Sequence, residues 1–262
     1  MLGMALTLHA EAGVGDPPDG ATTVDQRHPA HVAFIEAGGD GHLWLASPIP
    51  VSRGLGFSGA VRVAGAAVAL VQRDGAAALD DKSVLARLLS ISSRLEGHAD
   101  NVAASIYGGV VVAAGDHVIR VPLAFNPTVV VWIPDDTTTS TEQSRGRLPD
   151  AVPLGDAVFN IGRAATFVAA CAIGDHDALR IATEDRLHQP ARLAKVPSSA
   201  AAIDAALQAG AWAAWLSGSG PSVAALCETS RADEIVARLP ARGHTKLLRI
   251  DHEGVALVPG VV

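Results

Sequence analysis

Three glycines fall within six residues between an expected strand at 42–49 and an apolar run at 60–71. The segment reads PVSRGLGFSGA from Pro50 to Ala60. Glycines let the backbone turn its N–H groups toward one point, and a following helix would add the positive end of its dipole. That combination suits phosphates, and Ser58 would offer a hydroxyl to a phosphate or to Mg²⁺. A tight turn between a strand and a helix explains the same residues equally well, and no Gly-Lys-Ser/Thr of a Walker A loop follows.

A second polar group separates two apolar elements. It reads EGHADNV from Glu96 to Val102 and places carboxylate, imidazole and amide groups close together. Such side chains ligate metals and form hydrogen bonds. Asp100 or Asn101 also fits the N-cap of a helix, although a cap would not account for Glu96 and His98.

Two more segments carry candidate ligand-binding side chains. In Thr137 to Pro149, a helix starting near Ser140 would place Thr141 and Arg145 on one face, where hydroxyl and guanidinium groups suit a carboxylate or phosphate. A capped, solvated helix explains this pattern better when it is taken alone. The other segments are DRLHQPAR (185–192) and the glycine-rich loop SGSGPS (217–222), which lines a ligand or simply connects two elements.

The elements that would position these groups alternate between helix and strand periodicity. Helices are expected at 31–37, from Ser83 onward, and at 154–183, 198–209 and 229–238. Valine-rich runs between 107 and 133, the run 223–227, and the segments 245–250 and 254–258 indicate strands, whereas 16–31 indicates a loop. Strand runs and helix runs mix without strict β–α alternation, which favours an α+β fold in two lobes.

Composition narrows the classes of protein. With 262 residues, 49% of them apolar and 18% charged, the chain can bury an ample core. A formal charge of −7 without a basic run argues against nucleic acid as the main ligand. The two cysteines, Cys171 and Cys227, are expected to be reduced core residues of a cytoplasmic protein. We expect no membrane span and no signal peptide, since no stretch reaches ~18 charge-free apolar residues and the N-terminus lacks a positive region.

The order and spacing of these segments resemble the GHMP small-molecule kinases. Their motif Pro-x-x-x-Gly-Leu-Gly-Ser-Ser-x-Ala corresponds to Pro50, Gly54, Leu55, Gly56, Phe57, Ser58, Gly59 and Ala60. The branch that phosphorylates homoserine adds Glu-Gly-His-x-Asp-Asn-Val-Ala, intact at 96–103, and His-Gln-x-x-Arg at 188–192. It also adds a Ser-Thr-x-x-x-Arg-x-x-Leu-Pro segment, in altered spacing at 140–149, and the loop 217–222. The resemblance covers essentially the whole chain.

The resemblance implies a two-lobed α+β fold with its sites in the cleft between the lobes. The N-terminal, ATP-binding lobe (1–125) would resemble domain 2 of ribosomal protein S5, and a C-terminal lobe would span 126–262. The implied reaction transfers a phosphoryl group from ATP, with Mg²⁺, to L-homoserine, giving O-phospho-L-homoserine on the route to threonine. Positioning and charge neutralisation carry most of the catalysis of such a transfer. A cytoplasmic homodimer is implied as well.

The family's roles pass to the matching positions. The loop from Arg53 to Ala60, together with Pro50, would wrap the ATP phosphates, and Ser58 with Glu96 would hold Mg²⁺. Ser58, Glu96 and Asp100 are the candidate catalytic residues, although Asp100 fits a structural role better. The homoserine site would be lined by His98, Asn101, Thr141, Arg145, Arg192, Ser217, Gly218, Ser219 and Gly220.

Two departures from the family pattern keep alternatives open. Phe57 replaces the first serine of the Ser-Ser pair, and a bulky apolar residue is unexpected beside phosphates. The family's opening segment, which carries an Asn and an Asp that touch the substrate, is absent before Leu2, and we expect a misplaced start rather than a true truncation. The alternatives are another GHMP kinase, acting on mevalonate, shikimate or a polyol, and a non-catalytic nucleotide-binding relative.

Overall fold

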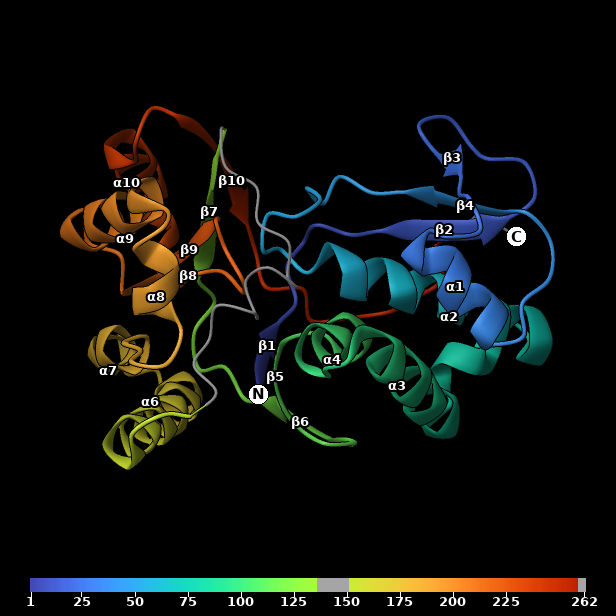
Figure 1. The fold of residues 1–262 in the computed structure, drawn as a ribbon, viewed down its shortest axis with the longest axis horizontal. Coiled ribbons are helices and arrows are strands. Elements are labelled where there is room, and N and C mark those ends of the chain that lie inside the picture. Colours follow the sequence, from blue (N-terminus) through green and yellow to red (C-terminus); the bar gives the residue numbers. More distant parts are fainter. Residues whose placement is uncertain (136–150, 259–262) are drawn as a thin grey trace. The chain divides into compact units, whose positions relative to one another are not determined.

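A computed structural model describes residues 1–135 and 151–258 (Figure 1). Its internal contacts divide the chain into two compact units. Unit 1 comprises Met1–Ile49, Gly56–Arg120 and Asp251–Val262, and unit 2 comprises Pro50–Leu55 and Val121–Ile250. The lobe boundary at 125/126 stays a prediction. Two segments belong by their contacts to a different unit from the residues before them in the chain: Pro50–Leu55 belongs to unit 2 and Asp251–Val262 to unit 1.

Unit 1 contains two small sheets of three strands. One has the order β1 (Leu2–Met4), β5 (Val110–Ala114), β6 (His117–Val121), and the other has the order β2 (Glu11–Val14), β4 (Leu43–Ala46), β3 (Thr22–Thr23). The expected strand at 254–258 is wrong, because this stretch forms no strand. Gly254 instead packs its backbone against Ile106 and Gly108, and Val255 N donates one hydrogen bond to Ile106 O (3.1 Å).

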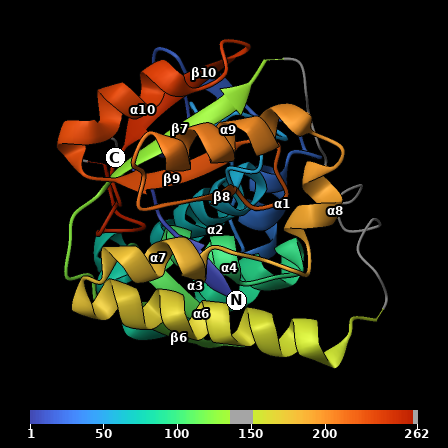
Figure 2. The same ribbon diagram turned by 90° about the vertical axis from the view of Figure 1, so that its left-hand side faces the viewer.

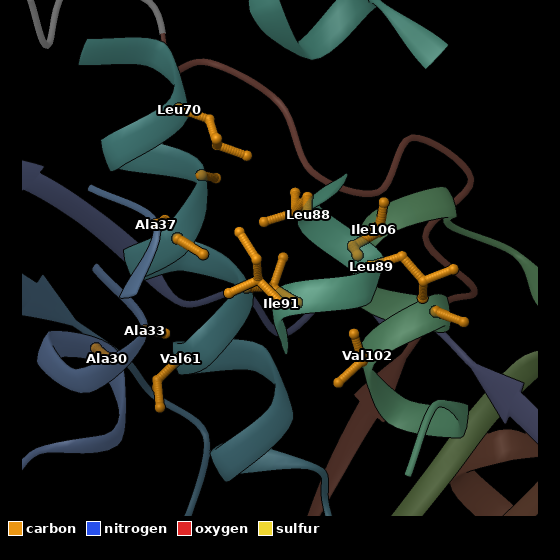
Figure 3. Close-up of a cluster of buried hydrophobic side chains, with 14 of the residues drawn as sticks. Ala30, Ala33, Ala37, Val61, Leu70, Leu88, Leu89, Ile91, Val102 and Ile106 are labelled. Carbon is orange, nitrogen blue, oxygen red and sulfur yellow. The ribbon is translucent and has the colours of Figure 1, made fainter. Parts of the chain in front are cut away.

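Four helices build the core of unit 1: α1 (Pro29–Glu36), α2 (Phe57–Asp74), α3 (Lys82–Glu96) and α4 (Asp100–Tyr107), with a short 3₁₀ turn, η1 (Ala76–Asp80), between α2 and α3. Figure 3 shows Leu88, Leu89 and Ile91 of α3 gathered with Val102 and Ile106 of α4, while α2 contributes Val61 and Leu70. The helix expected at 31–37 is α1, which starts two residues earlier, at Pro29. Its start lies inside the stretch 16–31 expected to be a loop, and proline suits the first turn of a helix.

The ends of α3 are set by residues that the sequence makes recognisable. The carboxylate of Asp81 accepts a hydrogen bond from Ser83 N (2.7 Å) and caps the first turn. Gly97 ends the helix in the left-handed region, with φ 80°. Glu96 is thus the last helical residue, and α4 begins four residues later at Asp100.

Unit 2 is built on one antiparallel sheet with the order β10 (Gly243–Leu248), β7 (Thr128–Pro134), β9 (Val223–Cys227), β8 (Ala213–Leu216). All residues of β7 and β9 are buried. Helices α9 (Pro197–Gln208) and α10 (Ala232–Arg238), the latter preceded by the 3₁₀ turn η2 (Thr229–Arg231), cover one face of this sheet (Figure 2). The buried indole of Trp132 donates to Pro240 O (3.0 Å), so its polar atom is satisfied inside the core.

The expected helix at 154–183 is two helices, α6 (Leu154–Ile173) and α7 (His176–Ala182), followed by the short α8 (Gln189–Leu193). Gly174, with φ 78°, ends α6, and the side chain of Asp175 caps α7. Among the described residues, α6 is the one helix long and apolar enough to cross a membrane. A single such helix is weak evidence for a span, and α6 also carries Asp156 and Arg163.

Gly65 on α2 provides a test of the helix packing in unit 1. A Cβ at this position would lie 2.1 Å from Ala30 O on α1, so the Gly65→Ala variant must push two helices apart. We expect it to lower the free energy of unfolding by about 1–3 kcal/mol despite alanine's better helix propensity. Gly162→Ala on α6, where no neighbour lies within 4 Å, is the matched control and should raise stability by about 0.5–1 kcal/mol. Equal effects in urea unfolding would contradict this packing.

Candidate active site

The phosphate-loop candidate is divided between the two units, with the boundary between Leu55 and Gly56. In unit 2, the Arg53 guanidinium donates to Pro134 O and to Asp135 O (3.2 Å) at the end of β7. Gly54, with φ 75°, lies so close to the 217–222 loop that a Cβ there would be 2.3 Å from Ser217 O. Ser217 Oγ donates to Gly54 O (2.9 Å), which brings together two glycine-rich segments that lie far apart in the sequence.

In unit 1, the second half of the loop forms the start of α2. Gly56 is the N-cap in the left-handed region (φ 73°), and α2 has no side-chain cap and no acidic residue in its first turn. The two glycines of this helix start, Gly56 and Gly59, face Asn101 of α4. A Cβ added at Gly56 would lie 3.4 Å from the Asn101 side chain, and one added at Gly59 would lie 3.2 Å from it. An 18-residue helix that opens with glycine and has no acidic residue of its own in the first turn suits an anion at its N-terminus.

A hydroxyl, a carboxylate and a guanidinium meet just inside this helix end. Ser58 Oγ donates to Glu96 Oε2 (2.6 Å), and Arg62 Nε donates to the same oxygen (2.8 Å). The Glu96 side chain is only 8% exposed. Ser58 and Arg62 share a face of α2 because they are four residues apart, whereas Glu96 comes from the end of α3. The sequence prediction included Ser58 and Glu96 but missed Arg62, which the i, i+4 spacing from Ser58 would have indicated.

His98 lies between two carboxylates. Its Nδ1 is 2.5 Å from Asp100 Oδ1, and its Nε2 is 3.7 Å from Glu96 Oε1. Burial opposes ionisation of Asp100, but the hydrogen bonds from His98 and from Asn101 N (2.8 Å) outweigh it and lower the pKa of this carboxyl. Asp100 therefore orients the His98 ring. The expected N-cap role of Asp100 or Asn101 is wrong, because Ala99 is the N-cap of α4 and no side chain caps this helix.

Unit 2 brings Arg192 to the same glycine loop that contacts Gly54. Arg192, on α8, donates through Nη1 to Gly218 O (3.0 Å) and lies 3.2 Å from His188 Nδ1. Within the loop, Gly220 N donates to Ser217 O (2.8 Å), which closes a tight turn. The loop 217–222 thus contacts two other segments expected to bind ligands, 50–55 and 188–192, within one unit.

Phe57 lies within the phosphate-loop candidate, but its ring packs against apolar neighbours. Its side chain packs against the hydrophobic core of unit 1 and meets the His28 ring edge-on, with centroids 6.1 Å apart. Burial lowers the pKa of His28, which favours the neutral ring. The aromatic residue is therefore a partly buried residue that packs on the core at the helix start, and the departure from the family's Ser-Ser pair leaves the Ser58 hydroxyl in place.

Two predicted site residues, Thr141 and Arg145, lie outside the described residues.

Both cysteines are free and buried, and burial raises the pKa of each thiol, Cys171 and Cys227, to about 11. Neither thiol is a nucleophile at neutral pH. In the described ranges 1–135 and 151–258, no group of three or more His, Cys, Asp or Glu side chains forms a metal cage.

The chain matches two family models: the GHMP kinase N-terminal domain over residues 26–109 and the GHMP kinase C-terminal domain over 167–245. A homoserine kinase of Moorella thermoacetica is 42% identical over 248 residues, covering 86% of this chain and 81% of the relative. A homoserine kinase of Thermus thermophilus is 40% identical over 210 residues, covering 78% of this chain and 70% of the relative.

Solved structures agree with this relationship. A homoserine kinase from Cytophaga hutchinsonii superposes with a TM-score of 0.75 at 27% identity, covering 92% of this chain and 82% of that one. L. major mevalonate kinase, at 17% identity and a TM-score of 0.66, shares the fold. The expected α+β fold of the GHMP kinases is confirmed, and the chain belongs to the homoserine kinase family within the GHMP kinases.

Proposed function

We propose that this protein transfers the γ-phosphoryl group of ATP to the side-chain hydroxyl of L-homoserine. A bond forms between the homoserine hydroxyl oxygen and the γ-phosphorus, and the bond from that phosphorus to the β–γ bridging oxygen breaks. The products are O-phospho-L-homoserine, an intermediate on the route to threonine, and ADP, with release of the hydroxyl proton. The relatives named homoserine kinase, with up to 42% identity, support this substrate.

The observation that carries the proposal is the contact of Ser58 and Arg62 with the Glu96 carboxylate at the start of α2. Mg²⁺ in phosphoryl-transfer sites is held by one or two carboxylates, hydroxyls and the substrate phosphates rather than by a cage of protein ligands. One hydroxyl and one carboxylate within 2.6 Å of each other fit that donor set. Ser58 and Glu96 would hold Mg²⁺, which would neutralise phosphate charge when it is bound with the nucleotide.

The residues of the chain then act by positioning and by charge. The backbone from Arg53 to Ala60, with Pro50, Leu55 and the uncapped start of α2, would bind the phosphates. Arg62 balances the charge of Glu96 while the carboxylate is buried. His98 and Asn101, with Asp100 orienting His98, would contact the amino acid.

Arg192 would pair with the homoserine carboxylate, beside Ser217, Gly218, Ser219 and Gly220. Arginine presents parallel N–H donors that match a carboxylate. Thr141 and Arg145 belong to the same proposal on the strength of their motif alone. We also propose the lobes 1–125 and 126–262 as the family's N- and C-terminal lobes, a homodimer, and a cytoplasmic location, which the free cysteines support.

Substrate selectivity tests the proposed reaction. ADP release is measured with Mg-ATP and, separately, L-homoserine, L-serine, mevalonate and shikimate. We expect turnover with L-homoserine and little with the other three. All four acceptors carry a carboxylate that Arg192 could bind, so selection must come from the amino group and from whether the hydroxyl reaches the γ-phosphate when the carboxylate is bound. Preference for mevalonate or shikimate would replace the substrate assignment, and nucleotide binding without turnover of any acceptor would favour a non-catalytic role.

The role of Glu96 predicts a change in metal dependence. In Glu96→Gln, the side chain keeps an oxygen acceptor but loses its charge, so the Mg²⁺ concentration for half-maximal rate should rise about tenfold or more. Glu36→Gln is the control, because Glu36 is also paired with an arginine (Arg94, 2.6 Å) but at the surface. Tm is recorded for both variants, since Glu96→Gln also leaves Arg62 without its anion. A folded Glu96→Gln protein with an unchanged Mg²⁺ titration would refute the metal role.

Arg192→Ala tests the substrate-binding arm. Loss of a charge-assisted contact of about 1.5–3 kcal/mol should raise KM for L-homoserine roughly 10- to 150-fold while KM for ATP changes little. The control is Arg186→Ala, which removes an exposed guanidinium from the same stretch of chain. Both KM values are measured by steady-state kinetics. An unchanged KM for homoserine in Arg192→Ala would show that this residue does not bind the substrate.

A further inference from the structure

A single buried carboxylate, that of Asp185, organises the segment that carries Arg192. The Asp185 side chain is 6% exposed. Its Oδ2 accepts hydrogen bonds from three successive backbone N–H groups, those of Leu187 (3.1 Å), His188 (2.7 Å) and Gln189 (2.6 Å). Although burial opposes ionisation, these bonds lower the pKa of Asp185, so the carboxylate is charged at neutral pH. It fixes the start of α8 three residues before Arg192.

The second oxygen of Asp185 anchors this start to another helix. Asn160 of α6 donates through Nδ2 to Asp185 Oδ1 and accepts through its own Oδ1 from Arg186 N (2.9 Å). The two side chains therefore form a reciprocal pair that ties residues 185–186 to α6. Such a fully satisfied network holds one backbone conformation more tightly than isolated contacts do.

Gln189 connects the far side of the same turn to the sheet. Its amide donates through Nε2 to Thr183 O (3.0 Å) and accepts through Oε1 from Leu216 N (2.8 Å). Leu216 is the last residue of β8, directly before the loop 217–222. The start of α8 is thus held at a set place beside the loop whose Gly218 O accepts from Arg192.

The ring of His188 gives Asp185 a second route to Arg192. A guanidinium can only donate, so the His188 Nδ1 that lies 3.2 Å from Arg192 Nη1 must accept, and the ring proton is on Nε2. That Nε2 is 3.6 Å from Asp185 Oδ1, whose negative charge favours a proton there. Burial lowers the pKa of His188, in agreement with a neutral ring.

We propose that Asp185 is the positioning residue for Arg192: it sets the start of α8 and the tautomer of His188, and so aims the guanidinium. This inference rests on the proposed role of Arg192 in binding the carboxylate of the acceptor substrate. Asp185 touches neither substrate nor nucleotide in this scheme. Its loss should therefore weaken binding of the acceptor more than it slows the transfer step.

The kinetic test compares two aspartates that both cap helices in unit 2. Asp185→Ala should raise KM for L-homoserine about tenfold or more and change kcat and KM for ATP about twofold at most. Asp185→Asn, which keeps one acceptor oxygen, should recover part of the loss. Asp175→Ala removes the cap of α7, where Asp175 accepts from Ala178 N (3.0 Å), and should lower Tm while leaving KM for homoserine unchanged. Overturning results are an unchanged KM in Asp185→Ala or an equal rise in Asp175→Ala.

Hydrogen exchange supplies a readout that needs no turnover. Peptides covering 187–192 should lose amide protection in Asp185→Ala and retain it in Asp175→Ala. If the wild-type protein does not phosphorylate homoserine, the proposed function fails, whereas unchanged protection of 187–192 in Asp185→Ala overturns the positioning role. Should Asp185→Ala fail to fold, Asp185→Asn and Asn160→Ala enter both measurements, and unchanged protection and KM in both would equally overturn it.

Discussion

The buried carboxylate of Glu96 is the group around which the start of α2 and the end of α3 are arranged. A carboxylate that is 8% exposed is costly unless donors compensate it, and here Ser58 and Arg62 converge on the same oxygen. The three side chains can meet only if the end of α3 is held against the first turns of α2. The packing of these helices and the burial of Glu96 therefore depend on each other, with Gly97 ending α3 and Gly56 starting α2.

The glycines of the loop allow close contacts that any side chain would prevent. Gly54 allows the first half of the loop to contact Ser217 and Gly220 in unit 2, while Gly59 allows α2 to approach Asn101 in unit 1. Any Cβ at Gly54 would overlap backbone atoms, which cannot move aside as a flexible side chain would. The glycine-rich pattern thus serves close packing within each unit as well as the exposure of N–H groups to an anion.

Phe57, the departure of this chain from the Ser-Ser pair of its family, shows that this position can be filled by a residue that packs on the core. Phe57 replaces a hydroxyl residue, yet its ring packs on the core and beside His28, so the helix start is kept. The neighbouring Ser58 still donates its hydroxyl to Glu96, the contact on which the proposed metal role rests. In the segment proposed to bind the acceptor, the side chains have different tasks. Gln189 ties the start of α8 to Thr183 and Leu216, whereas His188 contacts Arg192, whose guanidinium donates to Gly218 O.

The sequence by itself determined the family and the fold class, and it supplied most of the residues proposed for the site, because spaced glycines and clustered polar residues are local features of the chain. It also predicted most elements correctly, and the error at 254–258 arose because a strand depends on having a partner edge. Only the tertiary structure joined Arg62 to Glu96 and Asn160 to Asp185, since those contacts span 34 and 25 positions. Local periodicity contains no information about which distant side chain will satisfy a buried charge, and that choice is made by the packing of whole helices.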